Sequence, residues 1–200
     1  EIMDVVPGTH ASSTFMAYLA FNKYVPDIPL YREMYRLSGE SMHLSRMSLT
    51  HWLEKGSTHF CGLIAYLKNN CLEKDSIVNC DETWCRVKRE GCYKKKSIWC
   101  LVNKLSKVVV YCYEDGSQER DALKHILGDS QVKALQSDGY NVYMCLDDHM
   151  VDIEHLCCMA HARAKFKYAF DQGNDKDAAF ILELIGELYR LEREYEEGNR

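Results

Sequence analysis

The order of its strand-like segments restricts this chain to a small number of folds. Up to residue 75 the apolar residues recur at helical spacing, whereas from residue 76 they form short runs separated by turn residues. Three runs follow one another closely and predict an antiparallel meander: 76–81, 96–102 and 107–113. Helices and strands then alternate: a helix over 119–127, a strand over 132–137, a short helix over 141–146, a strand over 152–158 and a helix over 160–170.

This order matches neither a Rossmann unit nor a β-sandwich. It matches an α/β fold of the ribonuclease H-like class, whose mixed sheet has the strand order 3-2-1-4-5. In such a sheet the first and fourth strands are parallel neighbours, and a parallel pair requires a helical crossover. Before the sheet, the pattern predicts helices capped near Ser12 and Ser45. After it, residues 177–197 predict a long amphipathic helix with Phe180, Leu184, Leu188 and Leu191 on one face.

Two acids stand at the ends of strands that this fold makes neighbours. Asp81 closes the first strand and Asp138 closes the fourth, so both carboxylates would meet at one edge of the sheet. Paired carboxylates repel unless a divalent cation offsets their charge, and hard oxygen ligands suit Mg²⁺ or Mn²⁺. Phosphoryl transfer on DNA uses a pair of such ions. A structural alternative stays open, because Asp-Gly is a common turn and acids often close short strands.

The net charge of −5 argues against a simple basic DNA-coating protein. Residues 1–75 carry 7 basic and 8 acidic side chains, residues 76–170 carry 14 and 13, and residues 171–200 carry 4 and 9. The excess of acid therefore lies in the last segment, while the middle is neutral with a local basic run at Lys94, Lys95 and Lys96. Composition alone does not identify nucleic acid as the partner.

The ten cysteines do not form the framework of a small secreted protein. Four lie in apolar, strand-like runs, where a free thiol behaves as a small hydrophobe: Cys80, Cys85, Cys100 and Cys112. A metal-capable cluster, His155, Cys157, Cys158 and His161, has a crowded spacing that matches no ordinary zinc knuckle. No apolar run reaches the roughly 18 residues of a membrane helix, and no secretory leader opens the chain. We expect a reduced, cytoplasmic protein with no membrane partner, and, since the chain begins with Glu1, a piece of a longer protein.

Three segments, in order, carry a resemblance to a known family: Cys80-Asp81-Glu82-Thr83-Trp84, Leu135-Gln136-Ser137-Asp138-Gly139-Tyr140 and Cys158-Met159-Ala160-His161-Ala162-Arg163-Ala164-Lys165-Phe166. They resemble the Asp-Glu-Thr, Gln-x-Asp-Gly-Tyr and Cys-x-Ala-His-x-Arg-Arg-Lys-Phe motifs of transposases of the insertion sequence 66 family. Residues 23–32, 44–52 and 188–192 also resemble segments of that family. The likeness therefore covers nearly the whole chain.

The resemblance implies a bacterial DNA transposase with an acid triad (Asp, Asp, Glu; DDE) on a ribonuclease H-like fold. Asp81 and Asp138 match the first two acids and would bind Mg²⁺ or Mn²⁺. The third acid, a glutamate in an Asn-Asn-x-x-Glu context, has no counterpart here, and we expect it beyond residue 200. The expected domains are an N-terminal helical segment (1–75), an incomplete catalytic core (76–170) and the start of a C-terminal helical insertion (171–200). Three glutamates of that insertion stand in the wrong context to replace the missing acid: Glu183, Glu187 and Glu192.

Three residues of the last motif, His161, Arg163 and Lys165, would contact the DNA backbone near the metals. The structural alternative is a solvated basic helix face with a capped histidine. Ala164 stands where the family has a second arginine, which removes one phosphate contact. Glu82 points to the face opposite Asp81 and is interpreted as a supporting or structural residue. Three aromatic residues are expected in the core rather than stacked on bases: Trp84, Trp99 and Tyr140.

The leading hypothesis is therefore an enzyme that cleaves DNA and transfers strands at the ends of an insertion element. Its partners would be DNA of the element ends and target, and further copies of itself in a transposition complex. We expect this 200-residue chain to be inactive alone because it lacks the third acid. One alternative is a non-catalytic module of the same fold that docks DNA or a partner chain. Another is an unrelated nuclease of this fold.

Overall fold

A computed structural model of the chain describes residue 9 and residues 11–89, 91–114, 120–139, 141–143 and 153–198. The chain divides into two compact units, one up to Tyr66 and one from Leu67 onward. The domain limits expected from the sequence, 1–75, 76–170 and 171–200, remain predictions. In the described part of the chain, no helix combines the length and the apolar character needed to cross a bilayer.

The first unit is helical, as the apolar spacing predicts. It contains α1 (Ser13–Tyr24), α2 (Leu30–Gly39), α3 (Arg46–Ser57), the short helix η1 (Thr58–Phe60) and the start of α4 (Cys61–Cys71). The hydroxyl of Ser12 accepts a hydrogen bond from the Phe15 N–H at 3.2 Å, and that of Ser45 accepts one from the Ser48 N–H at 3.0 Å. Both predicted N-caps are therefore confirmed. The centre of this unit is apolar and fully buried: Leu19, Leu37 and Leu49.

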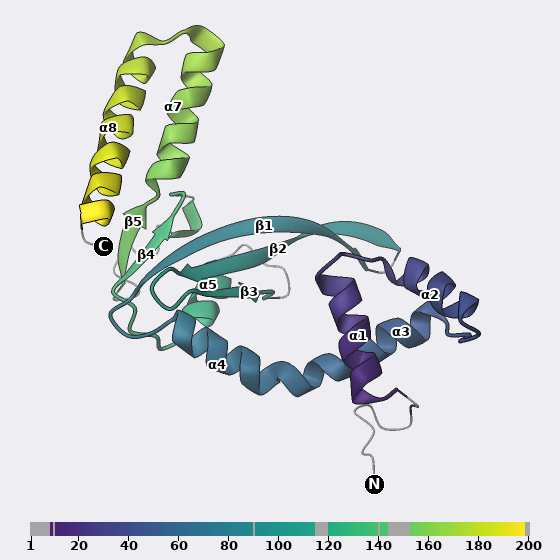
Figure 1. Ribbon diagram of the computed structural model, residues 1–200. Coiled ribbons are helices and arrows are strands. Elements are labelled where there is room, and N and C mark those ends of the chain that lie inside the picture. The colour runs from purple at the N-terminus through teal and green to yellow at the C-terminus, as the bar shows by residue number, and fades with distance from the viewer. Residues whose placement is uncertain are drawn as a thin grey trace. The chain divides into compact units, whose positions relative to one another are not determined.

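The second unit contains a five-stranded mixed sheet. Its strands are β1 (Ile77–Arg89), β2 (Cys92–Asn103), β3 (Val108–Cys112), β4 (Ala134–Ser137) and β5 (Glu154–Cys157). They lie in the order β3-β2-β1-β4-β5, with β1 antiparallel to β2 and parallel to β4 (Figure 1). The predicted α/β class and the strand order 3-2-1-4-5 are confirmed.

The crossover between β3 and β4 is helix α5 (Arg120–Leu127), which packs on one face of the sheet. Its buried side is formed by Ala122, Leu123, Ile126 and Leu127. These side chains join one cluster with the sheet residues Val78, Cys80, Trp99 and Leu101. Burying one leucine or isoleucine of this kind stabilises the fold by about 1.5–3 kcal/mol, so the crossover holds β4 firmly beside β1.

Strand β1 is longer than the sequence predicts. The expected end is Asp81, but the strand continues to Arg89 and pairs with β2 from Asn79↔Val102 as far as Arg89↔Cys92. The two strands therefore form a long ribbon that extends past the other three (Figure 1). The run at 76–81 indicates only the first part of the strand, since apolar residues alternate with polar and basic ones in the rest of it.

The prediction that the aromatic residues belong to the core is right for one residue and wrong for another. Trp99 is completely buried, whereas Trp84 is 50% exposed. Trp84 lies in the part of β1 that is paired with β2 beyond the end of the pairing with β4. Tyr140 lies outside the described residues.

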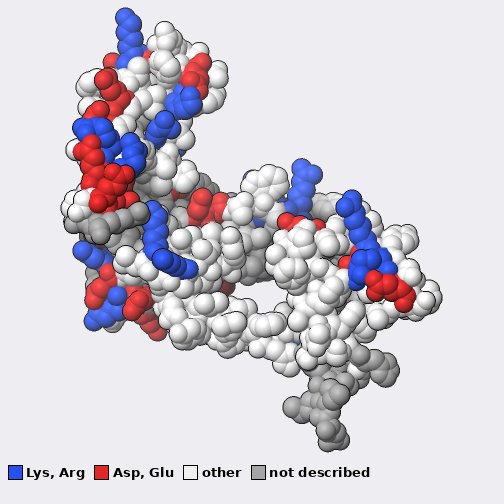
Figure 2. All heavy atoms as spheres, in the orientation of Figure 1, with Lys and Arg blue, Asp and Glu red and all other residues white. Residues whose placement is uncertain are grey.

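Helices α7 (Met159–Gly173) and α8 (Lys176–Gly198) form a hairpin beyond β5 (Figure 1). Asn174 ends α7 in the left-handed conformation, with φ 48° and ψ 41°. The predicted apolar stripe of α8 remains about half exposed: Phe180, Leu184, Leu188 and Leu191. The buried side chains of α8 are instead Ala178 and Ile185. On the face shown in Figure 2, acidic and basic side chains are interspersed along this hairpin.

Candidate active site

The parallel pairing of β1 with β4 aligns the two candidate acids. The paired residues are Ile77↔Ala134, Val78↔Leu135 and Asn79↔Gln136. Continuing this register by two residues sets Asp81 against Asp138, which directly follows the last residue of β4. Neighbouring strands lie about 4.8 Å apart, so the two acids occupy equivalent positions at the carboxyl end of the parallel pair.

Asp81 lies inside β1, contrary to the prediction that it closes the strand. The parallel ladder with β4 ends near Asp81, but the antiparallel ladder with β2 continues for eight more residues of β1. At Asp81, one edge of β1 is therefore paired with β2, while on the other edge the pairing with β4 has just ended. Its side chain is exposed, and one carboxylate oxygen accepts a hydrogen bond from the N–H of Glu82 at 3.0 Å.

A third carboxylate, that of Glu82, lies in the field of both acids. Burial is the main cause that raises the pKa of Glu82, and the negative charges of Asp138 and Asp81 raise it further. A hydrogen bond from the Tyr143 hydroxyl, at 2.7 Å from Oε2, lowers the same pKa. Because Asp81 and Asp138 both act on Glu82, the three carboxylates share one region of negative potential, which favours a cation.

Glu82 itself points to the core side of the sheet. Successive residues of a strand alternate between faces, and Cys80, two residues earlier, is buried in the cluster with α5. The Tyr143 hydroxyl contacts both groups, at 3.6 Å from Cys80 Sγ and at 2.7 Å from Glu82. Burial above all raises the pKa of Cys80, to about 12, so this thiol stays neutral and behaves as the small hydrophobe that the sequence predicts.

The turn that carries Asp138 is held by its neighbours. Ser137 is 1% exposed, and its hydroxyl lies 2.8 Å from Nε2 of His155 on β5. The N–H of Gly139 donates to the same hydroxyl at 3.3 Å. Gly139 has φ +79°, a conformation that glycine adopts without the strain of a side chain. The His155 ring stacks on the Tyr143 ring, with 5.9 Å between centroids. The residue that holds the Asp138 turn therefore packs against the residue that binds Glu82.

The start of α7 lies beside the same strand end. The N–H of Cys158 donates to the carbonyl of Ser137 at 2.7 Å, which ties the residue before α7 to the residue before Asp138. His161 follows in the first turn and is half-buried, while Arg163 and Lys165 are exposed. The motif that carries these three residues is therefore adjacent to the acids through a backbone contact.

The three candidate DNA-binding residues do not share one face of α7. Residues four apart stand on the same side of a helix, so His161 and Lys165 are neighbours, whereas Arg163 points to roughly the opposite side. Nδ1 of His161 is buried and has no hydrogen-bond partner among the described residues.

Within the described residues, no group of three or more His, Cys, Asp or Glu side chains is arranged to hold a metal ion. Neither the cluster of His155, Cys157, Cys158 and His161 nor the glutamates of α8 form such a group. His155 is engaged with Ser137 instead. Asp81 and Asp138 therefore stay candidate site residues, with Glu82 beside Asp81 in the chain.

The sequence analysis predicts no supporting role for these residues. Ser137 appears there only as a motif position and His155 only as a possible zinc ligand, and Tyr143 is not distinguished at all. The sequence gives one weak indication that Ser137 supports the site. Ser137 directly precedes Asp138, and successive strand residues point to opposite faces, so Ser137 would point away from Asp138. The contacts of Tyr143 with Glu82 join residues 61 positions apart, and no local pattern encodes them.

Comparisons with known proteins agree with the motifs. A family model described as "Transposase IS66 family" matches residues 8–200. Two uncharacterized proteins of Sinorhizobium fredii (strain NBRC 101917 / NGR234) are similar to the chain. The protein y4qI is 26% identical over 194 residues, which cover 90% of this chain and 35% of that protein. The protein y4jD is 24% identical over 207 residues, which cover 94% of this chain and 39% of that protein.

The chain thus spans somewhat more than a third of the length of the relatives that it matches. The family model, in contrast, covers all but the first seven residues of the chain. The chain belongs to the IS66 transposase family.

Proposed function

We propose that this chain is part of the catalytic domain of a DNA transposase, which cleaves DNA and transfers strands at the ends of its insertion element. The fold proposed for this domain is ribonuclease H-like, supported by the strand order β3-β2-β1-β4-β5 with α5 as the crossover. The observation that carries the proposal is the register of β1 and β4, which sets Asp81 and Asp138 at equivalent positions of two parallel strands.

The donor set suits a hard divalent cation. Asp81 and Asp138 offer carboxylate oxygens, the ligands that Mg²⁺ and Mn²⁺ prefer. Burial is the main cause that raises the pKa of Glu82, and the negative charges of Asp138 and Asp81 add to the rise. When bound, such ions would activate an attacking oxygen and stabilise the leaving oxygen of a phosphodiester. Two carboxylates hold a metal weakly, so the proposal includes a third acid outside this chain.

The other residues of the site have supporting roles in this proposal. Ser137 and His155 hold the turn that carries Asp138. Tyr143 holds Glu82, which follows Asp81 and points to the opposite face of β1. His161 and Lys165 would meet the DNA phosphates next to the acids, because the start of α7 is bonded to Ser137.

Cleavage by the whole protein that contains this chain tests the proposal. The substrate is a supercoiled plasmid that carries both ends of the element, incubated with Mg²⁺. We expect Asp81→Asn and Asp138→Asn each to lower the cleavage rate by roughly a thousandfold, because each removes a ligand of an ion that contributes several kcal/mol to the transition state. The matched control is Asp129→Asn, an exposed acid next to α5, which should cleave normally.

The alternative of a non-catalytic binding module predicts a different result. In that case the wild-type protein shows no metal-dependent cleavage, and Asp81→Asn leaves its behaviour unchanged. Cleavage that survives both substitutions would reject the assignment of these two acids.

A further inference from the structure

The β1–β2 ribbon carries the strongest local charge of the chain. Residues 84–97 contain six lysines and arginines and one acid, whereas the whole chain has a net charge of −5. The basic residues are Arg86, Lys88, Arg89, Lys94, Lys95 and Lys96. The basic run Lys94–Lys96 lies in β2, and the other three basic residues lie in β1, so both strands of the ribbon are basic.

Pairing across the ribbon places like charges together. Arg86 stands directly opposite Lys95 in the antiparallel register. Like charges directly opposite each other destabilise a strand pair. Within the described part of the chain, the side chains of Arg86 and Lys94 make no hydrogen bond and no ion pair. An anion that binds between the Arg86 and Lys95 side chains would offset this repulsion.

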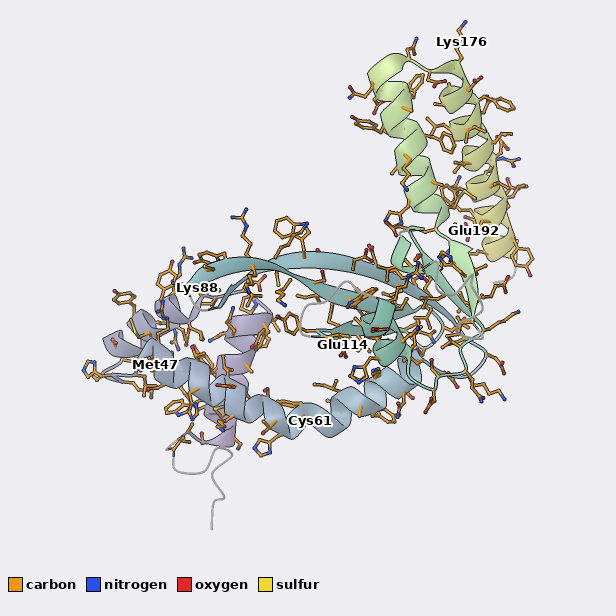
Figure 3. The ribbon with its side chains drawn as sticks, turned by 180° about the vertical axis from the view of Figure 1, so that it is seen from behind. Met47, Cys61, Lys88, Glu114, Lys176 and Glu192 are labelled. Atoms are coloured by element: carbon orange, nitrogen blue, oxygen red, sulfur yellow. The ribbon has the colours of Figure 1, made fainter. Side chains whose placement is uncertain are left out.

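Aromatic rings hold two of the ammonium groups in place. Nζ of Lys95 lies 4.6 Å from the centre of the Trp84 ring, and Nζ of Lys88 lies 6.0 Å from that of Tyr93. Both rings are themselves largely exposed, Trp84 by 50% and Tyr93 by 69%. The charges are thus presented outward on a preformed surface. In Figure 3, Lys88 lies toward the far end of the ribbon.

The ribbon begins at the candidate active site. Arg89 is eight residues beyond Asp81 on the same strand, which at a rise of about 3.3 Å per residue is roughly 26 Å. In duplex DNA this length corresponds to roughly 7–8 base pairs. Because side chains alternate between the two faces of a strand, Arg86, Lys88 and Lys95 lie on the face opposite Asp81 and Lys94 lies on the face of Asp81, so the ribbon beyond the acids carries basic side chains on both faces.

We propose that the β1–β2 ribbon is a DNA-binding arm, which contacts the phosphates of duplex DNA that flanks the cleavage point. The partner is a duplex because the inference rests on the proposed function, which acts on double-stranded element ends. The proposed contacts are to the phosphate backbone, which positions a protein on DNA without selecting a base sequence.

The test measures binding of the 200-residue chain to a fluorescent 30-base-pair duplex of unrelated sequence, by anisotropy at salt concentrations from about 50 to 200 mM. The test variant is Arg86→Gln with Lys95→Gln, the pair that stands face to face. We expect its affinity to fall by about tenfold and its salt slope to decrease by about two, because each of the two substituted side chains no longer neutralises a phosphate. The matched control, Lys74→Gln with Lys104→Gln, removes the same charge from two exposed lysines outside the ribbon and should bind like the wild type.

Folding of each variant is checked by its thermal melting curve. Because the substitution relieves a like-charge pair, the test variant should melt no more than slightly below the wild type. An equal drop in affinity for the test and control variants would overturn the inference. So would an unchanged salt slope in the test variant, or stronger binding of the wild type to a single strand of the same length.

The same assay separates this inference from the proposed function. The proposed function rests on two acids, Asp81 and Asp138, whereas the arm rests on the basic side chains of the ribbon. Suppose that cleavage by the whole protein does not depend on these acids while the ribbon variant binds DNA more weakly. The proposed function is then rejected, and the DNA-binding role of the ribbon is supported. If cleavage depends on them while the ribbon variant binds normally, the arm fails.

Discussion

At the scale of single residues, the best-defined polar contact lies in the helical unit. Glu33 is 1% exposed, and its Oε1 accepts hydrogen bonds from the Tyr18 hydroxyl at 2.6 Å and from Arg36 at 2.9 Å. Burial, the largest single influence, raises the pKa of Glu33. The hydrogen bonds from Arg36 and Tyr18 and the charge of Arg36 together lower it more, so the net pKa is below the ordinary 4.5.

This shift predicts a pH dependence of stability. Because the folded pKa lies below the unfolded one, the contribution is complete above about 4.5 and disappears as pH falls through the lower, folded value. Glu33→Gln should lower the free energy of unfolding by about 1–3 kcal/mol near neutral pH, and the difference should shrink in acid. Urea unfolding of both proteins across this range measures it.

The control for this prediction is Glu40→Gln. Glu40 also pairs with Arg36, at 2.6 Å, but its side chain is 61% exposed. An exposed pair of this kind contributes at most about 1 kcal/mol, so the control should unfold nearly like the wild type. A destabilisation by Glu33→Gln that is the same at every pH would contradict the assigned role of its ionised form.

At the scale of elements, the α7–α8 hairpin depends on two residues of its turn. Asn174 takes the left-handed conformation that ends α7, and Oδ1 of Asp175 accepts hydrogen bonds from the N–H groups of Asp177 at 2.8 Å and Ala178 at 3.1 Å. This is the geometry of an N-cap, which satisfies two N–H groups that the helix leaves without a carbonyl. The sequence pattern places the start of this helix near Asp177 without identifying its cap.

We expect Asp175→Ala to destabilise the hairpin by about 1 kcal/mol, because alanine can accept neither of the capping hydrogen bonds. Asp175→Asn is the matched control, since its side-chain oxygen can still cap the helix. Amide hydrogen exchange in the first turn of α8 measures the effect. Faster exchange in the alanine variant alone is the expected result, and equal protection in all three proteins would show that the cap contributes nothing.

At the scale of the whole molecule, the chain holds only part of the proposed catalytic machinery. Asp81 and Asp138 stand at equivalent positions of neighbouring strands, and the third acid implied by the family motif is expected beyond residue 200. The chain covers 35% and 39% of its two relatives, which leaves most of such a protein outside it. A pair of carboxylates holds one ion weakly and does not position a second.

We therefore predict that the chain alone, incubated with Mg²⁺ and plasmid carrying the element ends, produces no nicked or joined DNA. The whole protein under the same conditions is the positive control. Metal-dependent nicking by the 200-residue chain that disappears in Asp81→Asn would show that the site is complete without a downstream acid.

The sequence by itself determined the features that follow local rules. Capping serines, turn residues and the change from helical to strand spacing predicted the helices and the five strands, and their order predicted the pairing of β1 with β4. The position of Asp138 after β4 followed from its Asp-Gly turn. The caps, the turns and the spacing of each element depend on residues within about a dozen positions, so they are visible in one sequence, whereas the pairing of β1 with β4 followed from matching the order of the elements to a known fold class.

The tertiary structure alone decided how far each ladder runs and what surrounds each side chain. Strand β1 continues past Asp81 because β2 still pairs with it after β4 has ended, and that same extension leaves Trp84 exposed. The contacts of Tyr143 with Glu82 and of His155 with Ser137 join residues 61 and 18 positions apart. Such contacts depend on where separate elements meet in space, and the energy of packing sets that, not the periodicity of any one segment.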